Sequence, residues 1–600
     1  MPDTLQSGSD ILRREAQRAL EQGDTETAER RLAEALKRNA KDHGALALMA
    51  EVRLQQKNVT EAFSLYRDAV NAAPQVHWYK KRFLNLAGLG VAVNYSESLA
   101  NALVACLKTP DLASLLENWS SLLLAEPKFH AAYGLANRQD FDPSNRAFFA
   151  GLTDFRPLFT PLFLEGIKSN IVCSPVFEEF ITHIRRHLLF DLEPEGGRVT
   201  PEQFLALATA LSHYAFLTDF ILDSTEDEKR RTDELRRRVE TENDVTNDPA
   251  AVAVLACYQP LHTLKNAELI LDNFKTSGPL ADVVKSQIAD FFALREVASS
   301  ILSLTDIGEG VSTQVRELYE SFPYPRWKAI SAEGLEQDWQ KDECSRRAEG
   351  PLRGTRARIL VAGCGTGRDT AVLAAIFPDA IITAVDLSRT SLAYAAIRAE
   401  EHGLKNISFR HGDILKLTAL GGTFDYISST GVLHHMENPV EGWRVLCDLL
   451  KPGGLMRIGL YSEIGRKGVV AAHEAIKRAN YPSSPEGIAR FRRESPDICG
   501  RQTLLDLARL RDYYNMNMYR DLLFHFQEYR FDTLQIKDVL RELGLAFEGF
   551  NISAGTLAKY RDMFPDDPSA TNLERWNRFE KTNPQTFLSG YAFWCRKAGG

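Results

Sequence analysis

The chain has 600 residues, of which 44% are hydrophobic and 25% are charged, and its formal net charge is −8. This length predicts several domains rather than one. The negative charge gives no reason to expect a nucleic-acid partner. No apolar run approaches the roughly 18 residues that a membrane span needs, and no secretory signal is visible, so we expect no membrane partner and a cytoplasmic location.

The eight cysteines are scattered and form no Cys-x-x-Cys pair. This usage predicts reduced thiols rather than disulfides or a zinc site. The first nine residues are polar, and we expect them to be disordered. The chain from residue 10 to residue 76 then repeats itself, because "EQGDTETAERRLAEALKRNAKD" aligns with "QQKNVTEAFSLYRDAVNAAPQV" at a shift of 34 residues. Small residues recur at Ala28 and Ala62 and again at Ala35 and Ala69.

A 34-residue period with small residues where two helices meet resembles the tetratricopeptide repeat. Such arrays need about three units to bury a continuous core, so following helices must complete the stack. From 77 to 305 the spacing of apolar residues predicts a helical domain. We therefore expect an all-α, repeat-like N-terminal half.

A different segment, 306–354, follows the helices. Pro323 and Pro325 flank Tyr324 and favour extended backbone, and Trp327 lies just beyond them. Tyr319, Tyr324 and Trp327 could belong either to a linker or to a lid that closes over a ligand. The sequence leaves both interpretations open.

From residue 355 apolar strands alternate with helices, which predicts an α/β domain with a doubly wound, mostly parallel sheet. We expect strands at 358–363, 381–386, 406–410, 424–429 and 455–460, with helices between them. The pattern is interrupted at 461–530 and again at 553–588. A helix near 534–543 and strands at 545–551 and 590–596 complete the prediction for this domain.

The first of these strands ends in a glycine-rich turn that reads Gly-Cys-Gly-Thr-Gly at 363–367. Glycine allows positive φ and lets a ligand approach bare backbone. The third glycine comes two residues after the second, whereas the dinucleotide fingerprint places it three after. Arg368 stands where that fingerprint needs a small residue. The spacing therefore disfavours a dinucleotide enzyme.

Four stretches in this order resemble class I S-adenosylmethionine-dependent methyltransferases: "ILVAGCGTG", "HGDIL", "FDYISSTGVLHHMENP" and "LLKPGGLMRIGLYS". The resemblance implies a Rossmann-like domain that binds S-adenosylmethionine. It also implies that Asp386 holds the ribose hydroxyls, and that Asp413 and Ile414 contact the adenine. The donor-binding residues expected on this basis are Gly363, Cys364, Gly365, Thr366, Gly367, Asp386, Leu387, Asp413, Ile414 and Thr430.

One position departs from the family pattern. Val361 stands where many relatives carry an acidic residue that helps to bind the amino group of the donor. Another group, for example from the Tyr324–Trp327 segment, could serve that amino group. The individual residues also have structural explanations, since Gly363 could serve only the turn and Asp386 could only cap the next helix.

Methyl transfer from a sulfonium needs alignment, exclusion of water and removal of a proton, and it requires no metal. We therefore expect no metal site. The candidate acceptor-side residues are His435, which could take a proton near neutral pH, together with Tyr461, His525 and Glu528. Packing or helix-capping roles remain open for each of them.

Three functions fit these observations. The leading hypothesis is a methyltransferase acting on a protein or peptide side chain, with lysine nitrogen as the favoured acceptor, selected by the helical half. In the second, the acceptor is a small molecule and the helical half forms a homodimer. In the third, the chain is a donor-binding scaffold or sensor without transfer activity.

Overall fold

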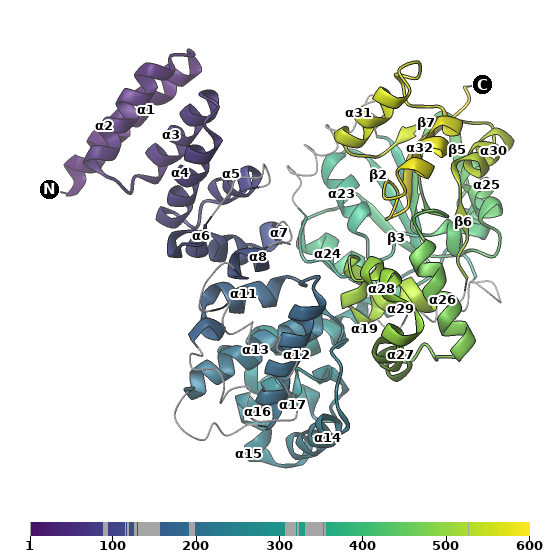
Figure 1. Cartoon of the computed structure of the whole chain (residues 1–600), viewed down its shortest axis with the longest axis horizontal. Coiled ribbons are helices and arrows are strands. Elements are labelled where there is room, and N and C mark those ends of the chain that lie inside the picture. Colours follow the sequence, from purple (N-terminus) through teal and green to yellow (C-terminus); the bar gives the residue numbers. More distant parts are fainter. Residues whose placement is uncertain are drawn as a thin grey trace. The chain divides into compact units, whose positions relative to one another are not determined.

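The computed structural model describes residues 2–87, 94–113, 116, 119–124, 129, 156–190, 199–306, 320, 323–330, 352, 356–525 and 527–599. The chain divides into two compact units, 1–287 and 288–600 (Figure 1). Tyr319 and most of the 306–354 segment lie outside the described residues. Among the described helices, none has both the length and the apolar character that crossing a membrane requires.

The first unit is helical, and its first four helices form two hairpins. They are α1 (Pro2–Glu21), α2 (Thr25–Arg38), α3 (His43–Gln55) and α4 (Val59–Ala72). We expected a disordered start, whereas helix α1 begins at Pro2 and packs along α2. The hydroxyl of Ser9 also donates a hydrogen bond to Asp42, which caps α3.

The repeat predicted from the 34-residue shift is present in the two hairpins. The aligned residues Ala28 and Ala62 are fully buried, as are Ala35 and Ala69. The two inter-helix turns also match, since Gly23 and Lys57, which are 34 residues apart, both have positive φ. Small side chains at the crossing points let the paired helices approach closely.

The remaining helices of this unit agree with the predicted all-α domain. Their bounds are α5 (His77–Ala87), α6 (Glu97–Leu107), α7 (Pro110–Ala113), α8 (Trp119–Leu124), α11 (Pro161–Ser169), α12 (Pro175–Phe190), α13 (Pro201–Leu217), α14 (Glu226–Thr241), α15 (Asn243–Thr246), α16 (Pro249–Leu255), α17 (Ala267–Phe274) and α18 (Ala281–Val284).

The second unit is built on an eight-stranded, mostly parallel sheet, as predicted. Seven strands lie in the order β3-β2-β1-β4-β5-β8-β7, and β6 pairs with β5. Only β8 is antiparallel to its neighbours β5 and β7. The strands are β1 (Arg358–Ala362), β2 (Ile381–Asp386), β3 (Ile407–His411), β4 (Phe424–Thr430), β5 (Leu450–Ser462), β6 (Arg530–Phe531), β7 (Leu545–Phe550) and β8 (Tyr591–Lys597).

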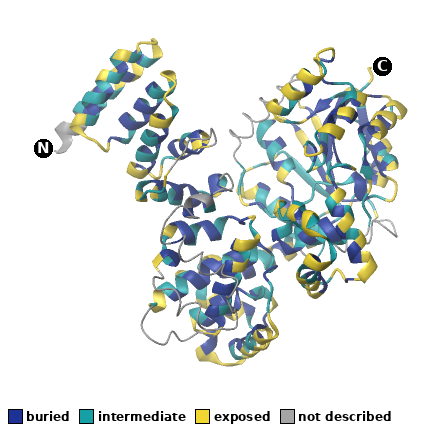
Figure 2. Ribbon diagram, viewed as in Figure 1, coloured by how far each residue is buried: buried dark blue, intermediate teal, exposed yellow. Residues whose placement is uncertain are grey.

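Each face of the sheet carries its own hydrophobic core. One core joins β1, β4 and β5 to α25 (Pro439–Leu449), α30 (Thr533–Glu542) and α32 (Leu573–Thr582). The other joins the opposite side chains of the strands to α23 (Arg368–Ile376). Figure 2 shows the central strands buried between these layers. Burial on both faces accounts for the nearly continuous apolar strands seen in the sequence.

The predicted boundary at 305/306 differs from the one in the structure, which lies between Gln287 and Ile288. Helix α19 (Asp290–Ser300) packs against α24 (Arg389–Glu401) of the second unit. The next residues run beside β3, where the amide of Leu304 donates to the carbonyl of His411 at 2.8 Å. Since this contact joins residues over 100 positions apart, local periodicity could not reveal it.

The two predicted interruptions form the helical cover of the second unit. The first contains α26 (Lys467–Ala479), α27 (Pro485–Ile498), α28 (Arg501–Leu507) and α29 (Met516–Phe524). The second contains α31 (Ala554–Met563) and α32. The first begins at the carboxyl end of β5, the edge at which open α/β sheets bind ligands.

Candidate active site

The glycine turn lies between β1 and α23, and its three glycines have positive φ of 74°, 51° and 78°. A Cβ on Gly363 would lie 2.3 Å from a methyl carbon of Val432, and one on Gly367 would lie 2.5 Å from that of Ala395. Gly365 is different, because the nearest atom to its Cβ would be the Tyr324 carbonyl oxygen at 3.9 Å. The turn therefore needs glycine for packing at both ends and leaves open backbone in the middle.

Asp386 ends β2 directly beside this turn. Its carboxylate accepts hydrogen bonds from the amides of Gly365 at 2.7 Å and Ser388 at 2.9 Å. Burial raises the pKa of the Asp386 carboxyl, and these amides oppose that rise. A fixed carboxylate with remaining lone pairs fits two ribose hydroxyls. Leu387 follows and accepts a hydrogen bond through its carbonyl oxygen from His411.

Cys364 and Thr366 line the same turn. Burial, and then the charge of Asp386, raise the pKa of the Cys364 thiol well above its usual range, so that the group is a neutral filler. The Thr366 hydroxyl donates to the carbonyl of Pro325 at 2.5 Å, and its own carbonyl accepts from the Trp327 indole at 2.8 Å. Pro325 and Trp327 therefore lie against the glycine turn. Whether they act as lid or linker stays a prediction.

The expected adenine edge follows β3. Asp413 is buried and caps the next helical turn by accepting from the amide of Leu415 at 3.0 Å. Its own amide donates to the Thr305 hydroxyl at 2.9 Å. Ile414 is buried in the core beside it. Thr305 was not anticipated, since it comes from the segment that joins β3 from outside the predicted domain.

Thr430 ends β4, and its hydroxyl donates to Asp369 at 3.2 Å. Asp369 also lies 3.5 Å from the guanidinium of Arg457 on β5. Neither charged residue was predicted. A charged side chain within the apolar run "LMRIGLYS" was nevertheless a signal, since arginine is rarely placed inside a buried strand.

The four predicted acceptor-side residues come together at the carboxyl ends of β4 and β5. His435 lies in a 3₁₀ turn after β4, and its ring stacks on His525 with 3.8 Å between centroids. Tyr461 lies 5.8 Å from His435, also between ring centroids. Glu528 accepts hydrogen bonds from Arg466, and the Arg466 guanidinium lies over the Tyr461 ring at 3.7 Å.

The geometry favours different roles for these groups. Burial, and next the neighbouring His525, lower the pKa of His435 to about 3. His435 bonds to the Gln527 carbonyl through Nδ1, which leaves Nε2 as the acceptor of the neutral ring. Glu528 is engaged by Arg466 in a buried ion pair of 2.5 Å. The assignment of any of these residues as proton acceptor stays a prediction.

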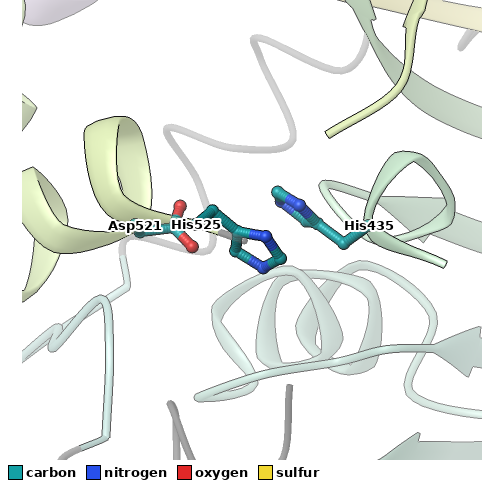
Figure 3. A group of neighbouring side chains, drawn as sticks. All are labelled: His435, Asp521 and His525. Atoms are coloured by element: carbon teal, nitrogen blue, oxygen red, sulfur yellow. The ribbon is translucent and has the colours of Figure 1, made fainter. Parts of the chain in front are cut away.

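Figure 3 shows His435 and His525 facing each other, with Asp521 on the helix that leads to His525. These three side chains offer ligand atoms within 4.8 Å of one another. Two imidazoles that bind one ion at about 2.1 Å would hold their centroids about 4.5 Å apart or more. The observed 3.8 Å is too short for a preformed metal site. The two rings form a buried, stacked pair at the carboxyl ends of β4 and β5.

A cavity of about 570 Å³ lies beside this cluster, at the ends of β4 and β5 and the start of β8. Its lining includes Thr430 and His434 together with residues of the connections around 551–556 and 585–592. The buried His434 ring lies against the Tyr461 ring, with 3.8 Å between their centroids. Burial is the main cause that lowers the pKa of His434 well below its usual range.

Residues 355–489 match the methyltransferase-domain family, and residues 19–82 match the tetratricopeptide-repeat family. An uncharacterized protein from Synechococcus is 32% identical over 303 residues, which cover 45% of this chain and 68% of that protein. A malonyl-[acyl-carrier protein] O-methyltransferase from Halalkalibacterium halodurans is 35% identical over 20% of this chain and 44% of its own length.

Among solved structures, PKMT2 from Rickettsia typhi in complex with AdoHcy is similar at 20% identity and a TM-score of 0.33, over 43% of this chain and 53% of that one. The match to the Halalkalibacterium O-methyltransferase spans under half of that protein's length. The glycine turn, the carboxylate after β2 and the family match agree on S-adenosylmethionine as the cofactor. The second unit of the chain therefore carries an S-adenosylmethionine-dependent methyltransferase domain, and its N-terminal half carries a tetratricopeptide-repeat region.

Proposed function

We propose that the protein transfers a methyl group from S-adenosylmethionine to a side chain of a protein or peptide, with lysine nitrogen as the favoured acceptor. The observation that carries the proposal is the pairing of a methyltransferase domain with a repeat region in one chain. Tetratricopeptide arrays present concave surfaces to extended peptides. The helical half would then select the acceptor.

The donor, when bound, supplies an electrophilic methyl carbon on a sulfonium. Gly363–Gly367 and Asp386 would hold it, and the buried cluster around His435 would orient the acceptor and exclude water. The neutral imidazoles suit an uncharged amine, because a protonated histidine there would repel both the sulfonium and an acceptor ammonium.

A small-molecule acceptor is the second candidate, and one observation favours it. The cavity of about 570 Å³ falls in the size range of small-ligand sites. The Halalkalibacterium relative is also named for O-methylation of malonyl-[acyl-carrier protein]. In that case the helical half would form a homodimer.

Methyl-labelled S-adenosylmethionine, incubated with the full chain and a lysate, tests these candidates. We expect label in the protein precipitate and methylated lysine after its hydrolysis. Asp386→Ala, which removes the carboxylate beside the glycine turn, should abolish the labelling. Label confined to the small-molecule extract would favour the second candidate. Donor binding without any transfer would contradict both and indicate a sensor.

A further inference from the structure

The lining of the cavity at the ends of β4 and β5 carries a positive charge and no negative one among the described residues. Among the described residues that line it, Arg457 is the only one with a charged side chain. The other polar side chains of the lining are uncharged, namely those of Thr430, His434, Tyr461, Asn551, Ser553, Thr556, Gln585, Thr586, Ser589 and Tyr591. A hollow with one cation and many neutral donors suits an anionic group.

Arg457 is incompletely paired for a guanidinium within a sheet. Its side chain is 23% exposed, and Asp369 lies 3.5 Å from one terminal nitrogen. Its Nε is buried and has no hydrogen-bond partner among the described residues. Since a guanidinium carries five N–H donors and a buried donor without a partner is costly, this side chain has capacity for another acceptor.

The cavity also adjoins the donor site. Thr430 and Gly431 line it, and the next residue, Val432, packs on Gly363 of the glycine turn. Asp369, two residues past Gly367, lies between Thr430 and Arg457. A group that leaves the glycine turn toward β4 therefore meets a carboxylate and a guanidinium side by side.

We propose that Arg457 binds a carboxylate in this cavity, with Asp369 placed to receive an accompanying ammonium. This inference rests on the proposed function. This carboxylate could belong to either of two molecules. It is either the amino-acid end of the methyl donor or a carboxylate of the methyl acceptor. The methyl donor as the source would explain why Val361 can replace the acidic residue of the relatives. Asp369 would supply the acidic group that the first strand lacks.

Calorimetry on the purified full chain separates the two sources. S-adenosylhomocysteine carries the amino-acid end, whereas 5′-deoxy-5′-methylthioadenosine lacks it. Arg457→Met should weaken binding of S-adenosylhomocysteine at least tenfold and leave methylthioadenosine within about twofold. Arg457→Lys should restore part of the difference. The matched control is Arg596→Met on β8, where the arginine pairs with Glu548 outside the cavity, and it should change neither affinity.

Succinate provides the second arm, titrated into the protein with and without saturating S-adenosylhomocysteine. Succinate binding that persists in the loaded protein and disappears in Arg457→Met would support the proposal with the acceptor as the source. The proposal is overturned if Arg457→Met changes neither succinate binding nor the ratio of the affinities for S-adenosylhomocysteine and methylthioadenosine. Equal loss of both nucleosides in Arg457→Met also overturns it, since that indicates a structural role. A wild-type chain that binds neither nucleoside contradicts the proposed function instead, and succinate then tests Arg457 alone.

Discussion

At the scale of single residues, two glycines of the 363–367 turn have different roles. Gly367 is needed for tight packing, and Gly365 leaves the backbone open. Gly367 is required by packing, since its Cβ would meet Ala395 at 2.5 Å, whereas Gly365 has no neighbour nearer than 3.9 Å. Both have positive φ, so an alanine at either site carries backbone strain of about 1 kcal/mol. The overpacking adds about 1–3 kcal/mol at Gly367 alone.

We therefore expect Gly367→Ala to lower the free energy of unfolding of the methyltransferase unit by about 2–4 kcal/mol, and Gly365→Ala by about 1 kcal/mol. Urea denaturation measures both. The main effect of Gly365→Ala should be weaker binding of S-adenosylhomocysteine, because this variant places a methyl group on the open backbone. Equal destabilisation by the two variants would refute this division of roles.

At the scale of elements, alternating strands and helices could be predicted closely from the sequence. The predicted strand 381–386 is β2 without change, and 590–596 differs from β8 by one residue at each end. Apolar runs fix these elements locally. The contact of residues 301–306 with β3 could not be predicted, because it depends on pairing between distant segments. The same holds for the ion pair between Arg466 and the predicted candidate Glu528, which lie 62 positions apart.

The 3₁₀ turn after β4 and the end of α29 bring two histidines into stacking contact, and this arrangement predicts a pH dependence. Burial, and next His525, lower the pKa of His435 to about 3, whereas the unfolded chain has a histidine pKa of about 6.5. Below pH 6.5 the unfolded state binds a proton that the native state refuses, so stability falls as pH falls.

From pH 7.5 to 5.5 this single histidine should cost about 1.4 kcal/mol of unfolding free energy. His435→Gln, whose amide can still donate to the Gln527 carbonyl, should reduce that pH dependence. Urea midpoints at several pH values provide the measurement. Parallel pH profiles for the variant and the wild type would show that His435 is not the source.

At the scale of the whole molecule, the two units divide the proposed work between them. The second unit contains the sheet, both of its cores and every predicted donor-binding residue. The first contains the repeat region that we propose selects the acceptor. Donor binding and acceptor selection should therefore be separable by cutting the chain between the units.

A fragment of residues 288–600 should bind S-adenosylhomocysteine within about threefold of the full chain, because the glycine turn and Asp386 come with their own cores. Its labelling of protein in a lysate should fall at least tenfold, since the recruiting surface is gone. Circular dichroism and calorimetry verify that the fragment is folded and binds. A fragment that labels the same proteins at the rate of the full chain would show that the acceptor is selected by the methyltransferase unit itself. The cavity that contains Arg457 would then be the first place to look for the selecting contacts.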